Sequence, residues 1–124
     1  MLSGDWRAWK SMMSGPSLGR IGRTDARSGV RLDAALAAKD WGTQVQFLVS
    51  NIKGPLTCRL VAVRTDGSSE VLSTWTVGDK GWGTAAQPEP LLLQGVTALP
   101  RADIAHLQVQ SIDSDGTTET LVTA

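Results

Sequence analysis

The chain has 124 residues, enough for one domain with a single packed core. Its 12 basic and 12 acidic residues cancel, which argues against nucleic acid or an anionic membrane surface as a partner. A single cysteine excludes an intrachain disulfide and a multi-cysteine zinc site, and no apolar run approaches the roughly 20 residues that cross a bilayer. We therefore expect one soluble domain with no cofactor.

The first 29 residues differ in texture from the rest of the chain. Trp6, Trp9 and Met13 recur at helical spacing, which indicates either a leader loosely held on the domain or an amphipathic anchor for a partner or membrane interface. The leader is the favoured interpretation, because about ten residues are too few for a stable isolated helix. The Gly-, Ser-, Pro- and Arg-containing stretch 14–29 predicts a linker, so the folded domain is expected over residues 30–124.

From Val30 onward, short runs of alternating apolar and polar side chains predict strands. The first run is also compatible with a helix because it is rich in alanine, but the following Asp40-Trp41-Gly42 corner favours a hairpin. Asp66-Gly67 is the strongest hairpin signal in the chain. The strands expected in this half cover residues 30–36, 44–49, 57–65 and 71–77. The run 57–65 has apolar side chains on both faces, which is typical of a strand in the middle of a sheet.

The second half opens with a loop at 78–83 and an extended, proline-containing stretch at 87–90. Leu91 to Leu93 is compatible with either a strand or a packed loop, and Pro100 predicts a single helical turn over 100–103. Two further strands are expected at 104–111 and 118–123. About seven short strands with turn residues between them predict an all-β fold, an antiparallel immunoglobulin-like β-sandwich.

No set of residues in the sequence has the pattern of a catalytic or metal site. His106 is the only histidine and lies on the polar face of a strand, so we interpret it as a surface residue. Cys58 alternates with core positions and is expected to be a buried, unreactive thiol. The acidic residues Asp66, Asp79, Asp113 and Asp115 all stand in turns. A calcium loop at 113–116 is a weak alternative for two of these acidic residues. Because no catalytic set of residues is found, we predict that the protein is not an enzyme.

The five tryptophans are an unusual share of the aromatic residues, since there is one phenylalanine and no tyrosine. Trp41 and Trp75 are predicted to lie in the core or to cover it. Trp82 stands between two glycines and is expected on a loop. There it would either stack on a sugar or a peptide or fold back over the core.

A series of short motifs resembles one protein family. The segments that carry the resemblance are Ser28-Gly29-Val30, Trp41-Gly42-Thr43, Thr57-Cys58-Arg59-Leu60-Val61-Ala62-Val63, Asp66-Gly67, Thr74-Trp75 and Gly95-Val96-Thr97-Ala98-Leu99-Pro100. In their order and spacing they look like the C-terminal extracytoplasmic domain of transmembrane zinc-finger anti-sigma factors from high-GC Gram-positive bacteria. The match covers residues 28–123.

The resemblance implies a non-enzymatic sensory or interaction domain on the outer side of the cell membrane, which regulates sigma-factor-dependent transcription. An unknown signal or protein would be its direct partner. The sigma factor and the membrane would be reached only through an N-terminal zinc-binding domain and a transmembrane helix, which this sequence lacks. The stretch 80–93 is also longer than the usual connection in the family. A protease acting on the linker 14–28 would be one way to transmit the signal.

Two alternatives of other classes remain open. The first is a secreted or surface β-sandwich that binds carbohydrate or peptide through Trp82 and its neighbours. The second alternative is a small hydrolase. It is the least favoured, because the sequence shows no nucleophile or acid–base set that would converge in one site. A cytoplasmic location is the alternative to an extracytoplasmic one.

Overall fold

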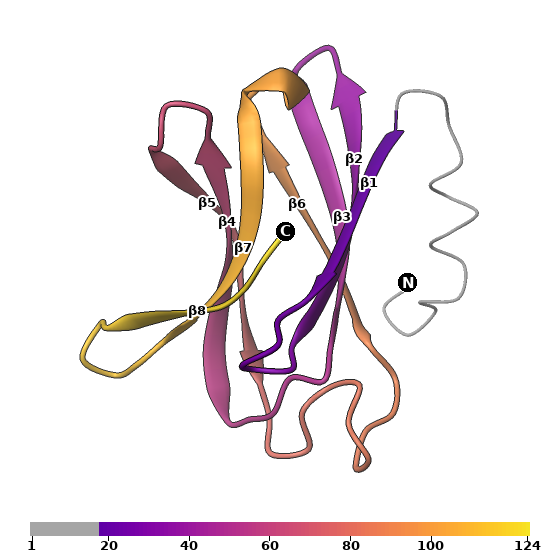
Figure 1. The fold of residues 1–124 in the computed structure, drawn as a ribbon, viewed down its shortest axis with the longest axis vertical. Helices are drawn as coiled ribbons and strands as arrows, with labels where there is room; N and C mark the ends of the chain where they lie inside the picture. The colour runs from indigo at the N-terminus through magenta and orange to yellow at the C-terminus, as the bar shows by residue number, and fades with distance from the viewer. Residues whose placement is uncertain (1–17) are drawn as a thin grey trace.

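The protein is a two-layer antiparallel β-sandwich of eight strands in a computed structural model, which describes residues 18–124. One sheet has the strand order β1-β2-β3-β6 and the other β5-β4-β7-β8 (Figure 1). The strands are β1 Leu18–Thr24, β2 Arg31–Lys39, β3 Gly42–Ser50, β4 Leu56–Arg64, β5 Ser69–Val77, β6 Leu91–Thr97, β7 Ile104–Ile112 and β8 Thr118–Thr123. A short 3₁₀ turn, η2 Arg101–Asp103, precedes β7.

The predicted all-β antiparallel sandwich is confirmed, and its connectivity is that of the immunoglobulin-like plan. Strands β2, β3 and β6 correspond to A, B and E of that plan, and β5, β4, β7 and β8 correspond to C′, C, F and G. Six of these seven strands were predicted from alternation. The segment 91–93, which the sequence left open between a strand and a packed loop, is the beginning of the seventh, β6. Where the plan has a strand D between C′ and E in chain order, this chain has the connection between β5 and β6.

The eighth strand, β1, corrects the sequence interpretation. Residues 18–24 lie in the stretch predicted as a linker, yet they pair along their whole length with β2, from Leu18 opposite Ala37 to Thr24 opposite Arg31. Of this strand, Ile21 packs against the core. A strand with two glycines, two arginines and one inward apolar residue shows little alternation, so its conformation depends on pairing with β2. The predictions for residues 1–17 lie outside the described residues.

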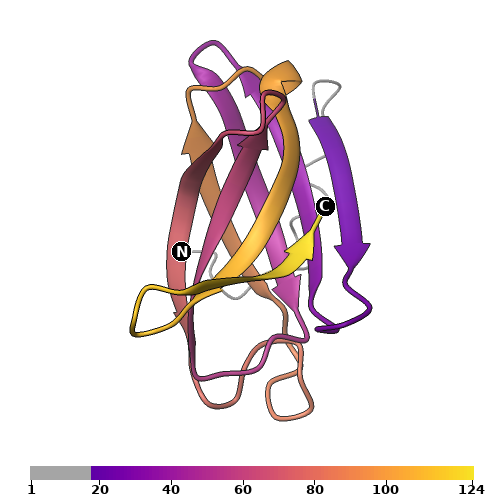
Figure 2. The same ribbon diagram turned by 60° about the vertical axis from the view of Figure 1, so that its left-hand side comes forward.

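The core lies between the two sheets and is made by every second residue of the central strands. On the face of β3 that lies against the other sheet, Val45, Phe47 and Val49 belong to the core, and on β4 Cys58, Leu60 and Ala62 do, as the period of two predicts. Strand β4 is central in its sheet, and Val61 on its other face is also buried, which confirms the prediction that both faces of this strand are covered. Both β7 and β8 contribute to this core, and only the turn end of their hairpin projects at one side of the sandwich (Figure 2).

Polar contacts link the two sheets where β5 passes β6. The Thr97 hydroxyl donates a 3.0 Å hydrogen bond to one carboxylate oxygen of Glu70. The other carboxylate oxygen of Glu70 accepts a 3.0 Å hydrogen bond from Arg64, so the carboxylate is shared between a cation on its own sheet and a buried threonine of the other. Because burying Thr97 without a partner would be costly, this contact favours one arrangement of the two layers.

Candidate functional site

The connection between β5 and β6, residues 78–90, forms a folded loop at one end of the sandwich (Figure 1). It carries Trp82, the residue that the sequence singled out as a possible ligand contact. The backbone of Trp82 pairs with that of Ile52, which follows β3: the Ile52 amide donates to the Trp82 carbonyl at 3.1 Å, and the Trp82 amide donates to the Ile52 carbonyl at 2.9 Å. Trp82 is therefore held by a contact 30 residues away in sequence.

Two glycines on either side of Trp82 make this close approach possible. Gly81 has a φ of +67° and Gly83 a φ of +66°, a region that residues with a side chain rarely adopt. A Cβ atom at Gly81 would overlap the Ile52 carbonyl oxygen, and one at Gly83 would lie 2.7 Å from the Asn51 nitrogen. The Gly-Trp-Gly sequence thus allows the backbone of residues 81–83 to pack closely against the backbone of residues 51–52.

Further hydrogen bonds fix the remainder of the loop. The Gly83 amide donates to the Glu89 carbonyl at 2.8 Å, and the Thr84 amide donates to the Gln87 carbonyl at 2.9 Å. The Thr84 hydroxyl donates to the Lys80 carbonyl at 2.6 Å and accepts from the Gln87 amide at 3.1 Å. Since most of these bonds close within the loop, it is organised before any ligand arrives, which lowers the entropic cost of binding.

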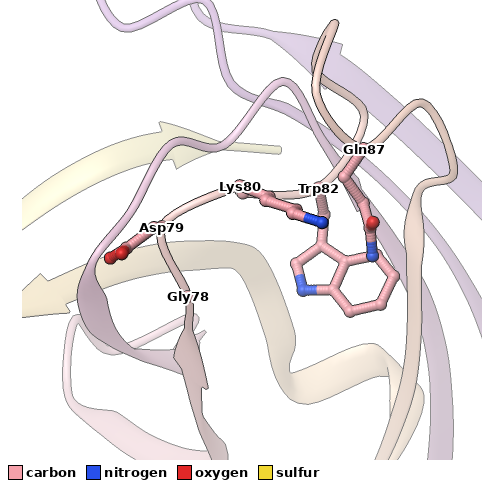
Figure 3. Close-up of a pocket in the computed structure, with 6 residues that line it drawn as sticks. Gly78, Asp79, Lys80, Trp82 and Gln87 are labelled. Atoms are coloured by element: carbon pink, nitrogen blue, oxygen red, sulfur yellow. The ribbon is translucent and has the colours of Figure 1, made fainter.

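A surface hollow of about 350 Å³ lies against this loop. Figure 3 shows the indole of Trp82 grouped with the side chains of Lys80 and Gln87, whereas the carboxylate of Asp79 points away from this group. Trp82 is half-buried and one part of it packs against the core. The alternative that Trp82 folds back over the core is thus confirmed in part, while the residue also lines the hollow together with an ammonium and an amide. Such a set can stack on a ring or a planar peptide group and donate hydrogen bonds to it. Stacking on a sugar or a peptide stays a prediction.

The residues of the family-like motifs are not brought together into one site. Trp41 stands in the β2–β3 hairpin, at the end of β3 opposite Trp82, and is 53% exposed. The prediction that Trp41 belongs to the core or covers it is therefore wrong, because a residue in a two-residue hairpin loop projects beyond the sheet. Thr43 is buried and its hydroxyl donates to the Leu99 carbonyl at 2.8 Å, and Arg59 donates to Gln110 at 2.9 Å on the outer face of the sheet.

The other motif residues also have structural roles. Trp75 packs against Phe47 with ring centroids 5.5 Å apart, as expected for a residue that covers the core. Leu60 is fully buried. In the Asp66-Gly67 turn, the Asp66 carboxylate accepts hydrogen bonds from the hydroxyl and amide of Ser68, and these bonds lower the pKa of the Asp66 carboxyl. In the same way, the Asp115 carboxylate accepts a hydrogen bond from the Thr117 amide, so the turn explains why an aspartate stands at this position.

The residues considered for chemistry lie apart from one another. His106 is exposed on β7, as predicted. In the part of the chain that the structure describes, no three His, Cys, Asp or Glu side chains gather closely enough to hold a metal ion. Within residues 18–124 there is likewise no helix long and apolar enough to cross a membrane. Lys80 and Gln87 were not recognised from the sequence as neighbours of Trp82, and the flanking glycines were the one local sign of a close backbone approach.

Cys58 is fully buried in the core, and desolvation raises the pKa of its thiol from 9.0 to about 11. The unfolded chain would lose this proton near pH 9, while the folded chain retains it. We therefore expect the contribution of this group to stability to be complete below pH 9 and to fall by about 2 kcal/mol as the pH rises toward 11. Urea unfolding at several pH values measures this loss. A Cys58→Ala variant is the control, because its stability should lack this component of the pH dependence; an unchanged dependence would contradict the assignment.

Comparisons of this chain with protein-family models, with curated proteins and with solved structures found no match.

Proposed function

We propose that this chain is a non-enzymatic interaction domain, and that it acts as the extracytoplasmic sensory domain of an anti-sigma factor. The observation that carries the proposal is where the family-like motifs lie in the sandwich. Trp41-Gly42-Thr43 makes the β2–β3 hairpin, Cys58-Arg59-Leu60 forms the middle of central strand β4, and Asp66-Gly67 makes the β4–β5 turn. The residues on which the resemblance rests thus form two hairpin turns and a central strand of the sandwich. These are the parts that two proteins with the same domain architecture would be expected to share.

In this role the domain would bind an extracytoplasmic signal or protein and pass the information to a sigma factor inside the cell. A ligand achieves this only by binding one state of the domain better than another. The stretch 18–28 is not proposed as a cleavage site, because it forms β1 and the hydrogen-bonded turn after it. A mechanism based on cleavage would need a site elsewhere.

The experiment is to read the gene upstream of Met1 and to test the complete protein. The proposal predicts an upstream apolar span and a His- and Cys-containing helical domain, and it predicts that a sigma factor co-purifies with the complete product. Deleting residues 18–124 should change transcription from promoters of that sigma factor in response to the extracellular signal. A gene that encodes neither upstream element would refute the proposal.

A second candidate function is the binding of carbohydrate or peptide at Trp82. It is supported by the hollow of about 350 Å³ beside a tryptophan whose loop is held by Ile52 and by internal hydrogen bonds. This function is compatible with the first, since the ligand would then be the sensed signal.

For this second function we expect Trp82→Ala to raise the Kd for the ligand at least tenfold, about 1.4 kcal/mol or more, because an anchoring aromatic side chain is removed. Glycan and peptide arrays with the unmodified protein would identify ligands, and calorimetry would give the Kd. Since Trp82 also packs on the core, two further variants that preserve more of the packing serve as controls. Trp82→Phe should retain part of the affinity, and Lys80→Ala should retain the fold. Blank arrays, or binding that Trp82→Ala leaves unchanged, would exclude this function.

A further inference from the structure

Among the residues that line the hollow beside Trp82, one is a cation and one is an acid. Figure 3 shows the ammonium of Lys80 beside the indole, whereas the carboxylate of Asp79 points away from it. Neither of the two ion pairs found within residues 18–124 includes Lys80. Glu89, the other acid of the loop, is exposed and does not line the hollow. The hollow therefore presents a positive charge to a ligand.

The polar side chains of the hollow can donate more hydrogen bonds than they can accept. In the described part of the chain, Lys80 and Gln87 make their hydrogen bonds through backbone groups, so the ammonium and the carboxamide stay available to a ligand. An ammonium only donates hydrogen bonds, whereas a carboxamide both donates and accepts them. The matching ligand is therefore rich in acceptors. A carboxylate, which only accepts, also balances the charge of Lys80.

The backbone around the indole is largely engaged inside the protein. Hydrogen bonds within the loop or with Ile52 use the amides of Gly81, Trp82 and Gln87 and the carbonyls of Gly78, Lys80, Trp82 and Gln87. A peptide bound in an extended conformation needs main-chain partners of this kind. Recognition that relies on side chains favours a carbohydrate, because its polar groups project from the ring.

The indole supplies the apolar part of the site. Trp82 is half-buried and its backbone is paired with that of Ile52, so the ring is held in place before a ligand arrives. One face of a pyranose ring carries C–H bonds and can lie against an aromatic ring. The hollow of about 350 Å³ is near the lower end of the usual range of ligand pockets, roughly 300–1,000 Å³, so it suits a short carbohydrate segment.

We propose that the ligand of the Trp82 hollow is a uronate, a sugar unit with a carboxylate, within an acidic carbohydrate. The inference rests on the second candidate function, the binding of a ligand at Trp82. The sugar ring lies on the exposed part of the indole, its carboxylate accepts a hydrogen bond from the Lys80 ammonium, and the Gln87 carboxamide bonds to its hydroxyl groups. A single ammonium matches the single charge of a carboxylate.

The test compares matched oligosaccharides by calorimetry with the unmodified protein. Oligomers of galacturonate, glucuronate and mannuronate are each compared with the oligomer of the corresponding neutral hexose and with their own methyl esters, which keep the ring and remove the charge. We expect at least one uronate to bind about fivefold or more tightly than both of its uncharged counterparts, because these lack a charge-assisted hydrogen bond. Raising NaCl from about 50 mM to about 500 mM should reduce this preference, since salt screens exposed charges.

Three lysine variants assign the preference to Lys80. Lys80→Met keeps the length of the side chain and removes its charge, so it should lose the preference for the uronate over its methyl ester. Lys80→Arg keeps the charge and should retain the preference at least in part. The matched control is Lys39→Met, because Lys39 is also exposed and pairs with Gly42 at the end of the sandwich opposite the hollow. This control makes the same change in net charge and should bind the uronate like the unmodified chain.

Nuclear magnetic resonance then locates the contact. Titration with the preferred uronate should shift the side-chain N–H signals of Trp82 and Gln87. The indole N–H signal of Trp41, an exposed tryptophan at the opposite end, should not move. A shift at Trp41 with none at Trp82 would contradict the assigned site.

The outcomes separate this inference from the function on which it rests. Binding of no carbohydrate and no peptide would overturn both. Preference for a neutral or sulfated carbohydrate, or for a peptide, over every uronate would overturn the uronate and leave binding at Trp82 in place. The uronate would also be excluded if Lys80→Met kept the full preference, or if Lys39→Met abolished it equally.

Discussion

Gly42→Ala is expected to destabilise the protein by about 3–5 kcal/mol, since it combines an unfavourable backbone conformation with a steric overlap. Gly42 begins β3 with a φ of +141°. A Cβ atom there would overlap the Thr97 carbonyl oxygen and lie 2.8 Å from the Cα atom of Ala98. Both neighbours are backbone atoms, so relief would require β6 to move away from β3. Urea unfolding followed by circular dichroism measures the change.

Two other glycines separate the two causes. Gly67 has a φ of +90° but nothing lies within 4 Å of its Cβ position, so Gly67→Ala should cost only about 1 kcal/mol for the backbone conformation. Gly78 has neither a positive φ nor a near neighbour, so Gly78→Ala should leave stability within about 0.5 kcal/mol. Equal losses in the Gly42 and Gly67 variants would show that the overlap with β6 has no energetic consequence.

Phe47→Ala is expected to cost about 3–5 kcal/mol, the range for removing a fully buried aromatic ring. Phe47 lies on β3 in the middle of the core, is 0% exposed and packs against the Trp75 ring of the opposite sheet. Its removal leaves a cavity between the sheets, which their backbones cannot close without losing contacts elsewhere. Thermal unfolding should show a Tm lower by more than about 10 °C.

The size of this loss should follow the volume removed. Phe47→Leu keeps most of the volume and should cost about 1.5 kcal/mol, whereas Val96→Ala, at an exposed position, should stay within about 0.5 kcal/mol. If Phe47→Ala had no larger effect than Val96→Ala, the ring would not be part of the core described here.

The candidate site could be predicted only in part. The sequence identified Trp82 as a loop residue because a tryptophan between two glycines is compatible with neither a regular strand nor a helix. The partners that shape the site could not be predicted, since Ile52 meets Trp82 through a backbone pairing across 30 residues and Gln87 returns to it through the fold of the loop. Nothing in a local pattern specifies such distant contacts.

By itself, the sequence determined the strands whose side chains alternate and the turns between them. Val45, Phe47 and Val49 recur with a period of two because each strand buries one face, and Asp66-Gly67 closes a hairpin through local backbone preference and one carboxylate. Only the tertiary structure decided that residues 18–24 form a strand, that Trp41 projects into solvent and that the backbone of Trp82 pairs with that of Ile52. These features depend on which strand lies next to which, and neighbours in a sheet are chosen by the packing of the whole sandwich.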